Sequence, residues 1–237
     1  MSLSIVTEEK EQDRAELIAP LWHTLALVLG LLALSAYGAH FVRTARPLVG
    51  YQKLVRYVLM IAIEWAMVAF VVWGIKGRIR LAELVGGKWR RPRDVLRDIG
   101  IAFVFLLGTY VVLITLTWIL RPGHSVGLER LLPHTRTQLC MFAAASFTAG
   151  VCEEIIFRGY LQKQLFSIFG NEVVSILFQA IIFGAAHGYQ GAKRMIVLGV
   201  FGFLFGLLAQ WRQSLRPGII AHGVNDLVGG LVFFLRH

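Results

Sequence analysis

Residues 151–159 read Val-Cys-Glu-Glu-Ile-Ile-Phe-Arg-Gly and lie between apolar stretches that are long enough to be membrane helices. A charged side chain at the centre of a bilayer costs roughly 2.5 to 3.5 kcal/mol, so this cluster requires partners, a polar cavity or protonation. On a helix, Glu154 and Arg158 are four residues apart and share one face, whereas Glu153 points about 100° away. The spacing therefore predicts an ion pair between Glu154 and Arg158 and leaves Glu153 as the unmatched acid.

The composition of the whole chain is typical of a polytopic membrane protein. Of its 237 residues, 57% are apolar and only 16% are charged. Apolar runs predict spans at about residues 21–42, 54–75, 99–120, 139–169, 172–187, 195–211 and 217–235. We therefore expect an all-α fold, a transmembrane bundle of about seven to eight helices.

The chain divides into three predicted parts. Residues 1–18 form a polar tail, residues 19–138 form amino-terminal membrane helices with a basic amphipathic loop at 76–98, and residues 139–237 form the helical core that holds the polar motifs. The basic loop places itself and the amino terminus in the cytoplasm, and it predicts contact with anionic lipid. Although the net charge is +10, no soluble basic face with interleaved aromatic residues is present, so nucleic-acid binding is not expected.

Several other side chains in the predicted spans have less specific interpretations. Glu64 lies at mid-depth of the second span and must face protein or water, either as a structural hydrogen-bonding group or as a proton carrier. His23 lies near the end of the first span and is interpreted as an interfacial histidine. Cys140 and Cys152 have no zinc spacing and are both predicted to be buried apolar thiols.

Two later spans carry polar groups on one helical face. Phe183 and His187 are four residues apart, with Gly-Ala-Ala between them. His222 and Asp226 are also four apart, and Asn225 is adjacent. Because ionisable groups in membrane spans are expensive, we predict that they converge with the acidic pair in a cavity between the last four helices.

Glu153, His187 and His222 suit two kinds of chemistry. A carboxylate can take a proton from water, while two imidazoles can bind a cation or an oxyanion. If a metal binds, three protein ligands and a water would suit zinc. The chain has no His-Glu-x-x-His or Gly-x-Gly-Asp segment, so the mechanisms tied to those two motifs are not indicated.

The three motifs in series resemble the signature of the CAAX-protease and bacteriocin-processing (CPBP, or Abi) family of intramembrane peptidases. The matching residues are Glu153-Glu154-x-x-x-Arg158, Phe183-x-x-x-His187 and His222-x-x-x-Asp226. The resemblance covers about residues 139–236, and Asp226 fits a position that is Asn or Asp in the family. It implies a membrane-embedded endopeptidase that hydrolyses a peptide bond near the membrane surface.

The resemblance also implies roles for these residues. Glu153 would activate a water for attack on a peptide carbonyl, with His187 as its principal partner. His222 and Asp226 would bind the developing oxyanion or orient the water. The family is often labelled metalloprotease, yet the set also suits a metal-free glutamate mechanism, so a zinc held by Glu153, His187 and His222 stays open.

The remaining motif residues are expected to support this site. Arg158 would hold Glu154 in place, and Phe183 and Asn225 would be substrate-binding or accessory residues. The substrate would be a peptide or protein, and the family name suggests a prenylated Cys-a-a-X tail. The expected location is the cytoplasmic membrane of a bacterium, and the sequence indicates no oligomeric state.

Two other functional classes are compatible with the same residues. One is a non-catalytic bacteriocin-immunity or scaffold protein, in which the motifs only stabilise helix packing. The other is an ion-coupled transporter, suggested by the buried acids together with Glu64.

Overall fold

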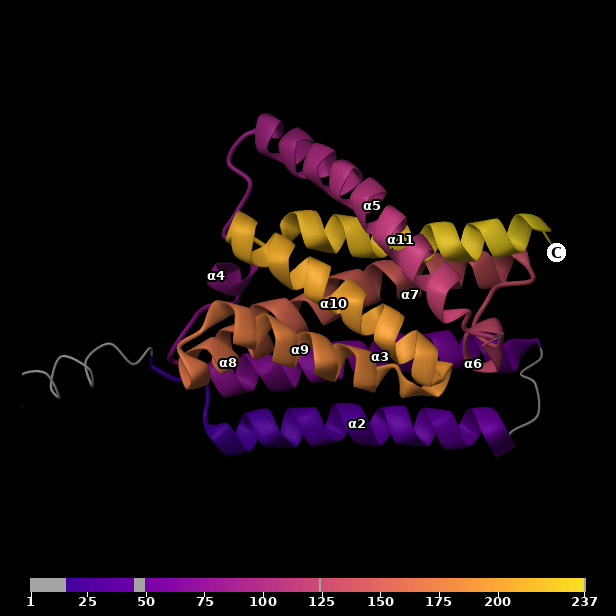
Figure 1. Ribbon diagram of the computed structural model, residues 1–237, viewed down its shortest axis with the longest axis horizontal. Helices are drawn as coiled ribbons and strands as arrows, with labels where there is room; N and C mark the ends of the chain where they lie inside the picture. The colour runs from indigo at the N-terminus through magenta and orange to yellow at the C-terminus, as the bar shows by residue number, and fades with distance from the viewer. Residues whose placement is uncertain (1–15, 45–49, 124, 237) are drawn as a thin grey trace, which may run out of the picture.

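The computed structural model describes residues 16–44, 50–123 and 125–236, and every regular element in these residues is a helix (Figure 1). Most of the polar tail predicted for residues 1–18 lies outside the described residues. Six helices are long and apolar enough to cross a membrane: α2 (Leu21–Thr44), α3 (Tyr51–Ile75), α5 (Pro92–Leu120), the continuous helix Arg136–Phe169, α10 (Ala192–Arg212) and α11 (Arg216–Arg236). Helix α9 (Glu172–Ala186) is shorter but apolar. The predicted all-α membrane bundle is confirmed, at the lower end of the predicted helix count.

The long helix that carries the acidic pair changes its hydrogen-bonding pattern in the middle. It comprises α7 (Arg136–Glu153), the π-helix η1 (Glu154–Leu161) and α8 (Gln162–Phe169). The sequence predicts the unbroken helix but not its π segment. All eight residues of η1 are buried. π segments inside α-helices are rare and occur frequently at functional sites.

Glycines bring the helices of the carboxy-terminal half close together. A Cβ atom built on Gly150 of α7 would lie 2.7 Å from the backbone nitrogen of Gly223 on α11. A Cβ on Gly206 of α10 would lie 2.7 Å from Nε2 of Gln179 on α9. This close packing sets the spacing of the polar motifs.

His23 joins the amino-terminal helices to the π segment. Its Nε2 donates a hydrogen bond to the carbonyl oxygen of Phe70 at 2.8 Å, and its Nδ1 lies 2.8 Å from the hydroxyl of Tyr160 in η1. The imidazole stacks on the Phe70 ring at 4.0 Å, in space that Gly74 leaves free. The interfacial prediction for His23 is therefore wrong, because its partners come from other helices that the sequence position does not reveal.

The basic loop contains less irregular chain than predicted. Helix α4 (Leu81–Val85) lies within the predicted loop at 76–98, and the last residues of that loop form the first turns of α5. Pro92 starts α5, and Asp94 accepts hydrogen bonds from the backbone N–H groups of Arg90 and Arg91 at 3.2 and 3.1 Å. Proline at the first helical position and a carboxylate in the first turn both favour helix initiation, so the helix begins before the apolar run.

The prediction for the cysteines is only half confirmed. Cys152 is buried, whereas Cys140 is exposed on the surface of α7. An apolar segment does not indicate by itself which face of a membrane helix meets lipid and which meets protein.

Candidate active site

The three polar motifs converge between α7, α9 and α11. Oε1 of Glu153 lies 3.8 Å from Nε2 of His187, and its Oε2 lies 3.7 Å from Nε2 of His222. Oδ2 of Asp226 lies 3.8 Å from the same His222 nitrogen. These separations exceed a direct hydrogen bond. The Glu153 carboxylate thus lies between two imidazoles that come from different helices.

Two fully buried side chains, Glu154 and Arg158, support this cluster on its inner side. Oε1 of Glu154 lies 3.0 Å from Nη1 of Arg158, so the ion pair predicted from their spacing is present. The same oxygen accepts a hydrogen bond from Nδ1 of His222 at 3.0 Å. Because Nδ1 carries the hydrogen in this bond, Nε2 of His222 faces Glu153 and Asp226.

His187 is oriented in the same sense by a different partner. It caps the carboxyl end of α9, and its Nδ1 lies 2.8 Å from the carbonyl oxygen of Phe183. A carbonyl oxygen only accepts, so Nδ1 must donate and Nε2 is left to face Glu153. Both histidines therefore present Nε2 to one carboxylate, as a site that handles a water or an oxyanion requires.

The exposed fraction of the side chains increases from the inner residues of the site to the outer ones. The side chains of Glu154 and Arg158 have no exposed surface, and that of His222 is 4% exposed. Glu153, His187 and Asp226 are 13%, 15% and 33% exposed, respectively. The supporting pair is therefore sealed from solvent, while the outer three side chains can be reached by a water or a substrate.

Aromatic rings enclose the guanidinium group of Arg158. Its Cζ lies 4.4 Å from the ring centre of Phe183 and 5.4 Å from that of Phe205. Such cation–π contacts help to hold a desolvated cation. Phe183 is only 1% exposed, so it supports the site from within the protein. Nδ2 of Asn225 donates to Oδ1 of Asp226 at 3.0 Å and so orients the outer acid.

Ser35 of α2 is a site-supporting residue that the sequence does not reveal. Its hydroxyl donates to the carbonyl oxygen of Ala185 at 2.7 Å and accepts from the N–H of Gly188 at 3.0 Å. These two groups flank His187 along the chain, so Ser35 fixes the backbone that carries the imidazole. A contact across about 150 residues leaves no local pattern in the sequence.

Glu64 of α3 adds another carboxylate to this region. It interacts electrostatically with Glu153 and with Asp226. Its Oε2 is buried and has no hydrogen-bond partner among the described residues. The sequence left a structural and a proton-carrying role open for Glu64, and an oxygen without a partner disfavours the structural role.

The site fits zinc in donor type but not in spacing. Two imidazoles and a carboxylate are ordinary zinc ligands, whose donor atoms lie roughly 3.3 Å apart when each bond is about 2.0 to 2.1 Å long. The observed separations around Glu153 are 3.7 and 3.8 Å. Across the described parts of the chain, no group of three or more His, Cys, Asp or Glu side chains is arranged to hold a metal ion.

Comparison with known proteins gives one result that bears on this site. Residues 135–228 match the family described as type II CAAX prenyl endopeptidase Rce1-like, and this segment contains all three polar motifs. No curated protein and no solved structure matches the chain. Together with the six membrane-length helices, the match shows an integral multi-pass membrane protein. Residues 135–228 are thus similar to the Rce1-like family of type II CAAX prenyl endopeptidases, in agreement with the family resemblance of the three motifs.

Proposed function

We propose that this protein is a membrane-embedded endopeptidase in which Glu153 activates the attacking water. The position of the Glu153 carboxylate carries this proposal. It lies between the Nε2 atoms of His187 and His222, at 3.8 and 3.7 Å, in the accessible layer of the site. A water at this point can lie within reach of the base and of both imidazoles, as general-base catalysis requires.

In the proposed reaction, Glu153 takes a proton from the water while the water oxygen bonds to the peptide carbonyl carbon. Nε2 of His222 donates a hydrogen bond to the carbonyl oxygen as it becomes negative, and Glu154 and Asp226 stabilise the positive charge on the donating imidazole. His187 orients the water. Glu153 then returns the proton to the leaving amine as the carbon–nitrogen bond breaks.

The proposed substrate is a peptide that reaches the site from the membrane. The description of the matched family makes a prenylated CAAX-like tail the first candidate. An unprenylated membrane peptide is the second. We also propose that the amino terminus lies in the cytoplasm, because the basic loop at residues 76–98 favours that side.

Cleavage of a fluorogenic peptide by the chain in lipid nanodiscs tests this proposal. A farnesylated CAAX peptide and its unmodified counterpart separate the two substrate classes. Glu153→Gln and His187→Ala are expected to abolish cleavage without loss of folded protein. Glu172→Gln is the matched control, because Glu172 is an exposed carboxylate at the start of α9. Full activity in both site variants would refute the mechanism.

The role of a metal is tested separately. A metal held by Glu153, His187 and His222 would supply Lewis-acid activation of a water. Elemental analysis and activity after chelation are expected to show a metal-free enzyme with unchanged turnover, because the described donor atoms are too far apart. Stoichiometric zinc that is lost in His187→Ala would instead establish a zinc enzyme.

The two non-peptidase classes give different results with the same Glu153→Gln variant. A scaffold or immunity protein would keep its protective phenotype in cells. An ion-coupled transporter would show ion-dependent flux in liposomes that the substitution removes. Neither result is expected from a peptidase.

A further inference from the structure

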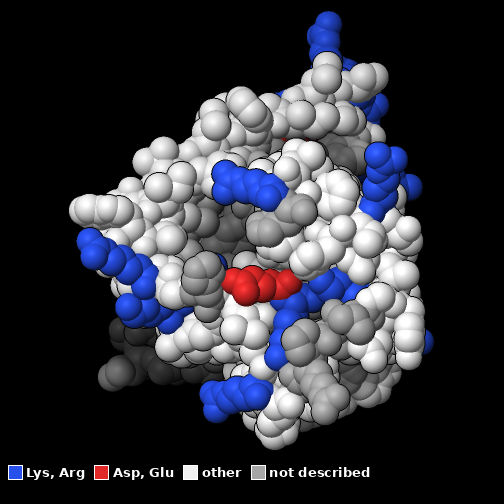
Figure 2. Space-filling view, turned by 90° about the vertical axis from the view of Figure 1, so that its right-hand side faces the viewer, with Lys and Arg blue, Asp and Glu red and all other residues white. Residues whose placement is uncertain are grey.

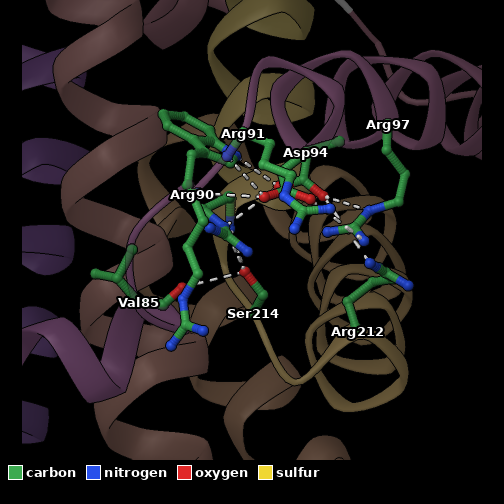
Figure 3. A network of polar contacts seen from close by, with 10 residues as sticks. Val85, Arg90, Arg91, Asp94, Arg97, Arg212 and Ser214 are labelled. Carbon is green, nitrogen blue, oxygen red and sulfur yellow. Dashed lines mark hydrogen bonds and ion pairs between the residues drawn. The ribbon is translucent and has the colours of Figure 1, made fainter.

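Arginines and two carboxylates, Asp94 and Asp98, form a polar network at the amino end of α5, far along the bundle from α6 (Val126–Glu129) (Figures 1 and 3). Asp98 has no exposed surface. Its two oxygens lie 3.2 Å from Nε of Arg216, 3.6 Å from Nε of Arg97 and 3.9 Å from Nη2 of Arg212. Arg97 also lies 3.9 Å from Oδ1 of Asp94, so three guanidinium groups face two carboxylates and the cluster keeps an excess of positive charge.

Among the described residues, the cluster contains two buried hydrogen-bond donors without partners and one unpartnered acceptor, Oδ1 of Asp98. Nε1 of Trp89 donates to Oδ2 of Asp98 at 2.8 Å and so uses part of the capacity of that carboxylate. Nε of Arg212 and Nη1 of Arg216 are buried and have no hydrogen-bond partner in the described parts of the chain. Buried donors without partners are costly, and guanidinium groups bind phosphate oxygens especially well. The arginines are therefore arranged to accept an anion.

An apolar groove begins at this cluster. It lies between α5 and α10, where α5 leans away from the bundle (Figure 1), and it has a volume of about 610 Å³. Arg97 lines the groove and also contacts Asp98, so the two features are continuous. The apolar lining includes Gly100, Ile101 and Val104 of α5 and Leu204, Leu207 and Trp211 of α10. The groove follows α5 from Arg97 to Phe105, about 12 Å at 1.5 Å per residue.

The positive charge at one end of the groove matches the headgroup of an anionic phospholipid, and the apolar lining of the groove matches an acyl chain. Trp211 is 68% exposed beside the arginines, and tryptophan is enriched at the level of lipid headgroups. On the molecular face at the α6 end, by contrast, Lys and Arg side chains are scattered over a largely uncharged surface (Figure 2).

We propose that this site binds one anionic phospholipid. Its phosphate lies against Arg97, Arg212 and Arg216, and one acyl chain lies in the groove between α5 and α10. The lipid ties α5 to α10 next to the pair Phe105 and Phe205, whose ring centres are 4.9 Å apart. This site is separate from the peptidase site, and its occupancy does not depend on catalysis.

Native mass spectrometry of the full chain with added phosphatidylglycerol or phosphatidylcholine of the same acyl composition tests the headgroup. Phosphatidylglycerol is expected to stay bound in a one-to-one complex and phosphatidylcholine to be lost. Arg97→Gln is expected to weaken phosphatidylglycerol binding about fivefold. The control is Arg93→Gln, since Arg93 is an exposed arginine one turn earlier on α5 and lies outside the cluster. Equal losses in the two variants would mean unspecific surface attraction and would overturn the proposal.

A matched pair of glycine variants tests the position of the acyl chain. A Cβ built on Gly100 or on Gly108 of α5 meets no atom within 4 Å, so a larger side chain fits at either position. Gly100 lines the groove and Gly108 does not. Gly100→Phe is expected to fill the groove and to remove phosphatidylglycerol binding, whereas Gly108→Phe keeps it. Binding that survives in Gly100→Phe overturns the assignment of the groove.

A competition experiment separates the lipid from the alternative occupant, the apolar tail of a substrate. Farnesylated peptide is added to the phosphatidylglycerol complex of the Glu153→Gln variant, which keeps the lipid site intact. The lipid is expected to remain bound. Its displacement by the peptide would assign the groove to the substrate and overturn the proposal. Because this measurement needs no cleavage, it stands even if the peptidase proposal fails.

Discussion

Oε1 of Glu154 accepts a hydrogen bond from Nδ1 of His222 at 3.0 Å, although the two residues are 68 positions apart in the chain. The same oxygen is 3.0 Å from Nη1 of Arg158. Glu154 thus connects a buried cation to the imidazole that faces Glu153. The two adjacent acids of the motif have different tasks: the inner one positions a histidine, and the outer one is available for chemistry.

Substitution of each acid should separate these tasks. Glu154→Gln leaves the buried Arg158 without its counter-charge and is expected to lower the free energy of unfolding by about 3 to 5 kcal/mol. Glu153→Gln is expected to abolish cleavage while the melting temperature stays within a few degrees. Thermal unfolding in one detergent, together with the peptide assay, measures both effects. A similar loss of stability in both variants would contradict the division of roles.

Ser35→Ala should impair catalysis as well as folding. The substitution removes two hydrogen bonds on either side of His187, each worth about 1 kcal/mol, so kcat is expected to fall roughly tenfold. The control is Ser175→Ala, because Ser175 makes a similar bond to the Asn171 carbonyl at the opposite end of α9. Steady-state kinetics and melting curves of both variants provide the comparison. An unchanged kcat in Ser35→Ala would exclude the positioning role.

Glu64→Gln should stabilise the protein and lower its rate of peptide cleavage. The substitution removes a buried carboxylate that interacts unfavourably with Glu153 and Asp226, so the free energy of unfolding is expected to rise by about 1 kcal/mol. Lower activity is expected as well, because the electrostatic environment of the base changes. The same melting and peptide assays detect this opposite pair of effects. Reduced stability would show that Glu64 has a structural partner after all.

Gly150→Ala should disturb the site through helix packing alone. The added methyl group would meet backbone atoms of α11 at 2.7 to 3.0 Å and force α7 away from His222. We expect a destabilisation of about 1 to 3 kcal/mol and a large loss of cleavage. Gly30→Ala on α2 is the control, since a Cβ there meets nothing within 4 Å. Melting temperature and cleavage rate should both stay near those of the parent in that control.

Contacts within one helix could be predicted from the sequence. The Glu154–Arg158 ion pair follows from a four-residue spacing, and the membrane helices follow from runs of apolar residues. The π segment could not be predicted, because its hydrogen-bond register depends on the packing of all eight of its residues against other helices. Local pattern therefore predicts which groups share a face but not how tightly that face is packed.

Contacts between distant helices required the structure. The bonds of Glu154 to His222 and of Ser35 to Gly188 join positions that no periodicity connects. The arginines around Asp98 illustrate the same limit, because the sequence shows a basic loop but not that Arg212 and Arg216 fold back against it. The chemistry of the motifs predicts that they converge, but it does not predict which residues of other helices hold them in place.

Buried hydrogen bonds join α8 and η1 to α2 and to the residues just before it. They make the folding of the matched segment 135–228 depend on the amino-terminal part of the chain. Nε2 of Gln164 donates to the carbonyl oxygen of Ala19 at 2.8 Å, and the hydroxyl of Tyr160 lies 2.8 Å from His23. Cut out at residues 135–228, the segment would carry the complete set of reactive groups but would expose these polar atoms to lipid. The segment that carries the reactive groups therefore cannot be moved alone into another membrane protein. A chimera that exchanges it must also include α2 and the turn that precedes it.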